Sequence, residues 1–269
     1  MAQGQDNPLN HVVDHHSLHL LWWEVPLPEI PFTGIPTTRF MVMEVVAAVL
    51  VAALAIPLAR HVAQNRVTRG WYMNLCESLV LFVRDGIARP AIGGHGADGF
   101  LPFLWTIFFF ILINNLLGLI PGGASPTGNI NVTGVLALLT LTTVILAGIR
   151  SIGPIKFWVS VVPKMDVPLL LKPPLWLLMF LIEWAGLLIR HLVLAVRLFA
   201  NMMAGHIVLA VILGFVVQVL GSYFIILVAP ASILGVVALS LLELFVAFLQ
   251  AYIFTFLAAL FIGMAVHPH

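Results

Sequence analysis

Long apolar runs separated by short polar segments dominate the chain. Three runs, at residues 40–59, 100–120 and 132–149, have about the length of the ~20 residues that cross a bilayer as a helix. Two longer runs follow, at 175–229 and 231–266. This pattern predicts an all-α integral membrane protein with upright transmembrane helices and a long, steeply tilted C-terminal helical hairpin.

The tilt follows from the length of the last run. A straight helix over residues 231–266 is about 54 Å long, whereas the hydrocarbon core is about 30 Å thick. It would have to tilt by about 56°, beyond the usual range of about 0–40°. Kinks at Gly205, Gly214, Gly221 and Gly235 are the alternative. We expect a steep hairpin that turns between residues 221 and 230.

The composition agrees with a membrane protein and excludes several kinds of site. Residues are 61% hydrophobic and 9% charged, whereas a soluble protein has about 25% charged residues. The net charge of +1 does not indicate a nucleic-acid partner. The single Cys76 excludes an internal disulfide and a metal site built from cysteines. We expect no cofactor, and the chain has no nucleotide-binding loop.

The distribution of basic residues predicts the topology. Five arginines lie between residues 60 and 89, and the turn at 121–131 has no Lys or Arg. By the positive-inside rule the first segment is cytoplasmic and the turn is outside, as is the N-terminus. The predicted regions are an external N-terminal segment (1–39), three transmembrane helices with an interfacial amphipathic helix at about 71–89 (40–150), a cytoplasmic connection (151–174) and the tilted hairpin (175–269).

The N-terminal segment contains a weak candidate metal site. His11, His15 and His19 would share one face of a helix and could bind a metal ion. Several prolines in the same segment disfavour a regular helix. We therefore expect an exposed polar segment at the membrane surface and no metal.

Arg197 is the most unusual residue of the apolar runs. A cation at membrane depth costs from about 2.5 to more than 10 kcal/mol, and a guanidinium cannot lose its proton to avoid that cost. Positions 193, 194, 200 and 201, one turn away, are Val, Leu, Ala and Asn, so no acid lies beside it on the same helix. We expect Arg197 to face a carboxylate outside this chain.

Further polar residues line up on the two predicted helices of the hairpin. Glu183, Arg190, Arg197 and Asn201 share a helix face because they are spaced by seven, seven and four residues, whereas His206 lies opposite Arg197. On the last helix Glu243 and Gln250 share a face, and counting from the turn brings them towards His206.

Two interpretations of these polar residues stay open. A titratable pair such as His206 and Glu243 at membrane depth is typical of a proton relay, but a static ion pair is possible. Asn114 and Asn115 in the second span fit either a functional site or hydrogen bonds between helices.

Four segments carry a resemblance to a known family. Arg197–His206 (RLFANMMAGH) resembles the signature of the a subunits of F-type ATP synthases. Asn115–Pro121 (NLLGLIP) and Ser125–Thr133 (SPTGNINVT) resemble an earlier helix and turn of these subunits, and Leu249–Phe254 (LQAYIF) resembles their last helix. The resemblance covers about residues 10–267 in the same order.

The resemblance implies a stator that holds a rotating ring of c subunits in a bacterial cell inner membrane. It implies that Arg197 is the essential arginine between two offset aqueous half-channels. Asn201, His206, Glu243 and Gln250 would lie along the outer channel, and Glu183 along the inner one. Arg190 and Asn115 complete the list of candidate ion-translocation residues.

The implied partners are the c ring, b-type peripheral stalk subunits, the other subunits and the lipid bilayer. ATP chemistry would belong to partner subunits, so the chain itself would not be an enzyme.

The chain departs from many relatives at several positions. His206 and Glu243 exchange the Glu and His of many bacterial relatives, which favours a contact between them. His191 stands where many relatives have Pro, and Gly118 where some have an acid.

Two other functions were weighed against this one. A stand-alone ion channel or secondary transporter could use Arg197 to bind an anionic substrate, but it predicts internal repeats that the sequence does not contain. A membrane metalloenzyme would need further metal ligands near the N-terminal histidines.

Overall fold

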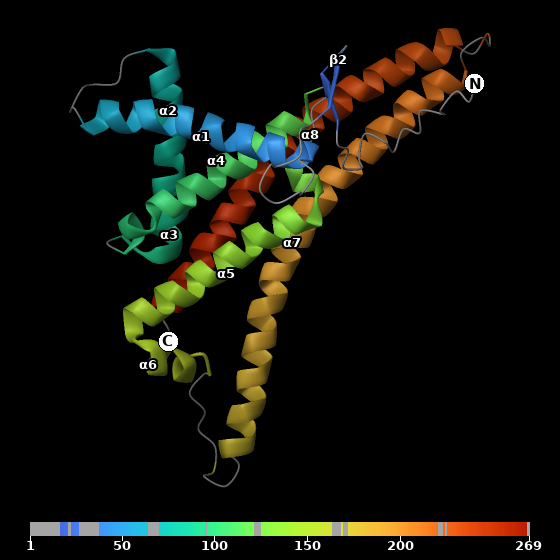
Figure 1. Cartoon of the computed structure of the whole chain (residues 1–269). Coiled ribbons are helices and arrows are strands. Elements are labelled where there is room, and N and C mark those ends of the chain that lie inside the picture. Colours follow the sequence, from blue (N-terminus) through green and yellow to red (C-terminus); the bar gives the residue numbers. More distant parts are fainter. Residues whose placement is uncertain are drawn as a thin grey trace. The chain divides into compact units, whose positions relative to one another are not determined.

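The computed structural model is helical over nearly all of the residues that it describes (Figure 1). These residues are 17–20, 23–26, 38–63, 70–94, 96–120, 125–162, 168, 172–219, 223 and 225–267. The helices are α1 (Arg39–Ala63), α2 (Trp71–Leu81), the π-helix η2 (Phe82–Ala88), α3 (Arg89–Ile92), the 3₁₀ turn η3 (Ala97–Gly99), α4 (Leu101–Gly118), the 3₁₀ turn η4 (Pro126–Gly128), α5 (Ile130–Ile152), α6 (Pro154–Ser160), α7 (Lys172–Gln218) and α8 (Ile225–Val266).

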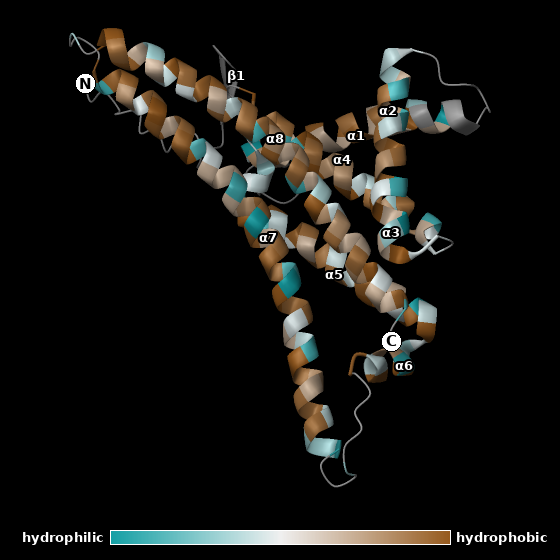
Figure 2. Cartoon of the chain, turned by 180° about the vertical axis from the view of Figure 1, so that it is seen from behind, coloured by the Kyte–Doolittle hydropathy of each residue, from teal (hydrophilic) through white to brown (hydrophobic). Residues whose placement is uncertain are grey.

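Five of these helices are long and apolar enough to cross a membrane: α1, α4, α5, α7 and α8. Hydrophobic residues predominate along these helices (Figure 2). The last two have 47 and 42 residues and are separated by residues 219–224. The predicted all-helical fold with two long C-terminal helices is therefore confirmed, whereas the tilt in the bilayer and the division into regions stay predictions.

A short β-hairpin in the N-terminal segment adds to the predicted fold. Strands β1 (Ser17–Leu20) and β2 (Trp23–Pro26) pair antiparallel. Apolar residues alternate along both strands, and Pro26 stands at the end of its strand, where a missing N–H is tolerated. The sequence predicted only that this segment would not be a regular helix.

The hairpin bears on the candidate metal site. His19 lies in β1 opposite Glu24, so it is not on a helix face. His11 and His15 lie outside the described residues. Among the residues that the structure describes, no group of three His, Cys, Asp or Glu side chains is placed to hold a metal ion.

The chain forms two compact units, and several helices contribute to both. The first comprises residues 1–56, 109–132 and 198–251, and the second comprises residues 57–108, 133–197 and 252–269. The C-terminal part of α7 and the first part of α8 thus belong to the first unit.

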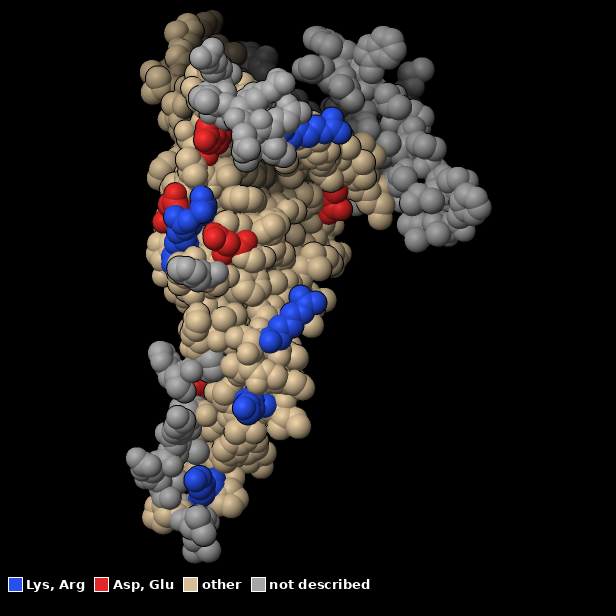
Figure 3. Space-filling model, turned by 90° about the vertical axis from the view of Figure 1, so that its left-hand side faces the viewer, with Lys and Arg blue, Asp and Glu red and all other residues tan. Residues whose placement is uncertain are grey.

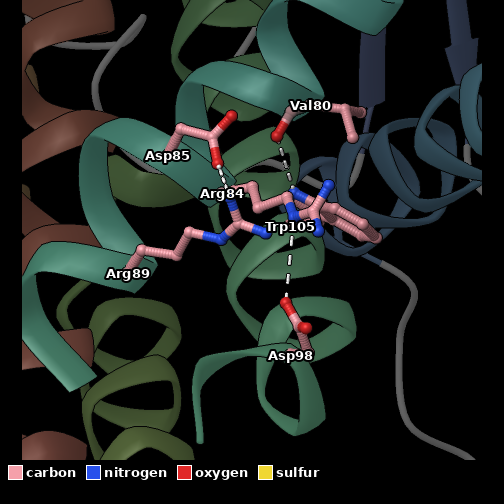
Figure 4. A network of polar contacts seen from close by, with 6 residues as sticks. All are labelled: Val80, Arg84, Asp85, Arg89, Asp98 and Trp105. Atoms are coloured by element: carbon pink, nitrogen blue, oxygen red, sulfur yellow. Dashed lines mark hydrogen bonds and ion pairs between the residues drawn. The ribbon is translucent and has the colours of Figure 1, made fainter. Parts of the chain in front are cut away.

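In the second unit, α2, η2 and α3 continue into one another and are joined to the start of α4 by polar contacts (Figure 4). The indole Nε1 of Trp105 donates to the Val80 carbonyl at 3.1 Å. Arg84 Nε lies 3.7 Å from Asp98, and Arg89 donates to Asp85 at 2.8 Å. The helix that the sequence predicted at about 71–89 is therefore present and extends to Ile92, and its place at the membrane surface stays a prediction.

The end of α8 packs closely against α3 in the same unit. Gly263 faces the backbone of Ala91, and a Cβ on Gly263 would lie 3.1 Å from the Ala91 carbonyl carbon. Nearby, the Ser151 hydroxyl donates to the Val266 carbonyl at 3.2 Å. This approach of two backbones requires a residue without a side chain at position 263.

Candidate functional site

A small cavity in the first unit brings together three of the polar residues that the sequence singled out. Asn201 and His206 of α7 and Glu243 of α8 line it. The other lining residues are Leu119, Met202 and Val246. The hairpin of α7 and α8 therefore brings Glu243 to His206, as residue counting from its turn predicted. Asn201, which the sequence placed on the face of Arg197, lines the same cavity.

Glu243 fits against α7 because position 205 is a glycine. A Cβ built on Gly205 would collide with the Oε1 atom of Glu243. The carboxylate thus lies against the backbone of α7, beside His206. Among the described residues, no hydrogen bond or ion pair joins His206 to Glu243. The two groups therefore share a cavity without forming a static ion pair.

Asn201 and Gln250 form a direct bridge between α7 and α8. The Asn201 amide Nδ2 donates to Gln250 Oε1 at 3.1 Å. Gln250 is 3% exposed, and its Nε2 is buried without a hydrogen-bond partner among the described residues. Asn201 is exposed. An amide donor that has no protein acceptor is a natural partner for water.

Arg197 lies on α7 one turn before Asn201 and is partly exposed. Its Nε and Nη2 atoms are buried without a hydrogen-bond partner, and it takes part in no ion pair within the described chain. Leaving a buried charged donor unpaired is costly. The guanidinium therefore has room for an acceptor that the described residues do not supply.

Arg190, in contrast, has partners within the second unit. Its Nη2 lies 3.7 Å from Glu183 Oε2, and its Nε donates to the Gly186 carbonyl at 3.0 Å. The guanidinium carbon also lies 5.9 Å from the ring centroid of Phe261. The side chain is thus folded back along α7 towards Glu183. The structure distinguishes two arginines that the sequence placed on one face.

Asn115 does not line the cavity. It is 1% exposed, accepts a hydrogen bond from Thr127 Oγ1 at 2.8 Å and donates to the Ala247 carbonyl at 3.4 Å. His191 is also buried, with Nδ1 2.9 Å from the Leu187 carbonyl oxygen and its ring 4.9 Å from that of Phe261. Both residues therefore have packed protein surroundings.

Sequence reasoning gave no site role to Gly205, Ser125 or Thr127, and it considered Gly205 only as a possible kink. Their importance depends on which atoms meet across helices, and no spacing along the chain reports that. The only signal was their presence inside the stretches that carry the family resemblance, Arg197–His206 and Ser125–Thr133.

Charged side chains are few on the surface around these helices, as Figure 3 shows for one face. A charged residue in one of these apolar helices is therefore stronger evidence of a specific role than it would be on a soluble protein, where about a quarter of the residues are charged.

Known proteins resemble the chain over most of its length. Residues 41–263 match the family model described as ATP synthase A chain. The chain is 42% identical over 264 residues to ATP synthase subunit a of Chloroherpeton thalassium, covering 96% of this chain and 76% of that protein. It is 39% identical over 274 residues to ATP synthase subunit a 2 of Chlorobaculum tepidum, covering 98% and 75%. It is also 42% identical over 235 residues to ATP synthase subunit a of Myxococcus xanthus, covering 86% and 74%. The chain therefore belongs to the family of F-type ATP synthase a subunits.

Proposed function

We propose that the chain forms two offset half-channels against a ring of c subunits, with Arg197 between them. The coarser statement follows from the family: the chain is a multi-pass, non-catalytic membrane subunit of an ATP synthase that takes part in proton translocation. The observation that supports the finer proposal best is the guanidinium of Arg197, which has no partner acid in the described chain.

Arg197 separates the two paths by its charge. A guanidinium stays protonated at any physiological pH. It attracts a deprotonated carboxylate on the ring and repels a proton that would cross directly from one path to the other. The ring then has to turn for a proton to pass.

The outer path runs through the cavity of the first unit. Asn201, Gln250, His206 and Glu243 provide amide, imidazole and carboxylate groups within one hairpin. A proton reaches the ring carboxylate through water held by these groups. The neutralised carboxylate can then turn into lipid, because its charge is gone.

The inner path begins near Glu183. This carboxylate is partly exposed, and its Oε2 lies 3.7 Å from Nη2 of Arg190. A ring carboxylate that reaches it after almost a full turn releases its proton to the cytoplasm. Each charge that crosses gains roughly 2.3 kcal/mol per 100 mV of membrane potential.

The partners follow from the same proposal. Residues 60–89 face the cytoplasm, the N-terminus lies outside in a bacterial inner membrane, and a c ring and b-type stalk subunits surround the chain. Co-purification with a ring of small helical-hairpin subunits would support this assembly. A chain that transports ions alone after reconstitution would contradict it.

Replacing Arg197 tests the central role. Arg197→Ala is expected to abolish proton-driven ATP synthesis in inverted membrane vesicles, because it removes a guanidinium that lies in an apolar helix with two buried nitrogens free of hydrogen bonds among the described residues. Arg150→Ala, at the exposed end of α5, is the matched control and should leave synthesis unchanged. Near-normal coupled synthesis by the Arg197 variant would sink the assignment.

A further inference from the structure

We infer that Asn115, Thr127 and Ser125 form a clamp that fixes the position of α8, and with it Glu243 and Gln250. They are positioning residues that act through α8, and none of them carries protons. The inference rests on the proposed outer path and reassigns Asn115, which the resemblance suggested as an ion-translocation residue. We call these three residues the turn clamp.

The turn clamp is a buried chain of hydrogen bonds with a fixed direction. Thr127 Oγ1 donates to Asn115 Oδ1 at 2.8 Å. Ser125 Oγ lies 2.7 Å from Thr127 Oγ1. The Thr127 hydroxyl has only one proton and donates it to Asn115, so it can only accept from Ser125. Ser125 Oγ also lies 3.5 Å from the Asn114 carbonyl oxygen, and the shorter contact with Thr127 is the stronger of the two. Thr127 is therefore the central link of the chain.

All three side chains are shielded from solvent. Asn115 is 1% exposed, Thr127 0% and Ser125 3%. Both ends of the Asn115 amide are used, since Oδ1 accepts from Thr127 and Nδ2 donates to α8. A buried amide that bonds a neighbouring element at each end holds these elements firmly, and its shielding from solvent makes it poorly suited to pass protons.

The contact with α8 falls between the two polar residues of the outer path. Asn115 Nδ2 donates to the Ala247 carbonyl at 3.4 Å. Ala247 is four residues after Glu243 and three before Gln250, so each lies about one turn from it. A shift of α8 at this point moves Glu243 away from Gly205 and Gln250 away from Asn201.

The turn also sits directly on α4 and α7. A Cβ on Gly118 would lie 2.5 Å from Ser125 Cβ and 2.8 Å from Met202 Cε. Gly118, where some relatives have an acid, thus leaves room for the turn and for the residue next to Asn201. Through these contacts the turn clamp joins α4, α7 and α8 within the first unit.

Thr127→Val tests the inference, because valine keeps the shape of threonine and removes the central hydroxyl. We expect proton conduction by the assembled membrane sector to fall about tenfold, since Asn115 is left with a buried unpaired acceptor. Thr127→Ser retains the hydroxyl and should restore conduction. If the serine and valine variants conduct protons at the same rate, the Thr127 hydroxyl does not hold α8 in place.

A geometric readout separates this inference from the proposed outer path. A Cβ on Gly235 of α8 would lie 4.0 Å from the Ile212 side chain of α7. Cysteines at 212 and 235, in a chain with Cys76→Ser, report the register of the two helices by their rate of disulfide formation in assembled membranes. Thr127→Val should slow this rate severalfold, and Thr127→Ser should not.

The combined outcomes are unambiguous. An unchanged disulfide rate in the valine variant overturns the turn clamp. A slower rate with unchanged proton conduction supports the clamp and contradicts the role of Glu243 and Gln250 in the outer path. If the valine chain does not accumulate in membranes, Ser125→Ala removes only the outermost donor, and the same slowing is expected to a smaller degree; no slowing overturns the clamp.

Discussion

The position of the Glu243 carboxylate depends on the glycine at position 205 of α7, which has no side chain. The carboxylate occupies the space where a Cβ of Gly205 would lie. This contact keeps the acid against α7 and beside His206, and no hydrogen bond to His206 is needed to hold it there. The position of the Glu243 carboxylate thus depends on how it packs against the backbone of α7.

Gly205→Ala is expected to push the Glu243 carboxylate out of its place and to slow proton conduction. The new methyl group meets the flexible end of a side chain, so the chain should still fold. Its free energy of unfolding should fall by no more than about 3 kcal/mol. Proton uptake by vesicles driven by a potassium diffusion potential measures the effect. Glu243→Asp in the same chain shortens the acid and should recover part of the rate; no recovery would mean that the collision is not the cause.

The two arginines of α7 are expected to differ strongly in their tolerance of substitution. Arg190→Gln removes a pair whose side chains are 43% and 36% exposed, and such pairs contribute about 0–1 kcal/mol. ATP synthesis should therefore fall by no more than about fivefold. Arg197→Gln should leave no measurable synthesis. Equal losses of ATP synthesis in the two variants would show that the pairing of Arg190 with Glu183 does not make the two arginines differ.

For single residues, the sequence predicted which parts of the two long helices face each other better than it predicted individual hydrogen bonds. Counting from the turn brought Glu243 and Gln250 towards His206, because residues at equal distances before and after a short turn face each other in a helical hairpin. The hydrogen bond of Gln250 with Asn201 was not predicted. The same counting said nothing about Thr127, which reaches Asn115 only through the fold of the turn. The pairing of Arg190 with Glu183 was also invisible, since Arg190 and Arg197 occupy equivalent positions on the helix face.

At the scale of elements, the end of α8 and the short helix α3 meet backbone to backbone. Gly263→Ala would place a Cβ against the Ala91 carbonyl oxygen, and a backbone cannot rotate away as a side chain can. We expect a loss of about 1–3 kcal/mol in stability, seen as a lower midpoint of thermal unfolding of the detergent-solubilised complex.

Gly214→Ala is the matched control for this prediction. Gly214 lies inside α7, and a Cβ there would meet nothing within 4 Å. Alanine favours helix over glycine by about 0.8–1.0 kcal/mol, so this variant should be as stable as the parent or more so. If the midpoint of thermal unfolding falls for both Gly263→Ala and Gly214→Ala, then α7 and α8 do not tolerate alanine in place of glycine in general, and the contact with Ala91 is not the specific cause.

The elements themselves were largely readable from hydropathy, because a span of about 20 apolar residues has few alternatives to a helix. All five apolar helices were predicted. The π-helix η2 was not, since its widened turn depends on contacts such as that of Trp105 with Val80. The hairpin of β1 and β2 was also missed, because prolines near it masked a short alternating pattern.

For the whole molecule, the predicted topology can be tested by labelling. In a Cys76→Ser chain, Asn65→Cys should react with a membrane-impermeant maleimide only in inside-out vesicles, because five arginines mark residues 60–89 as cytoplasmic. Gly122→Cys should react only from the outer side. The opposite pattern would invert the assignment of the outer and inner paths.

The exposure of α7 has a consequence for the life of the subunit in the cell. Its most apolar window is 0% buried within the described chain, and the same helix carries Arg190, Arg197 and Glu183. Acyl chains can cover the leucines of this helix, but they solvate an unpaired guanidinium poorly. A newly inserted copy that meets no ring therefore presents a surface that quality-control proteases can recognise. Its survival, and hence the number of finished motors, should follow the supply of ring subunits more closely than its own rate of synthesis.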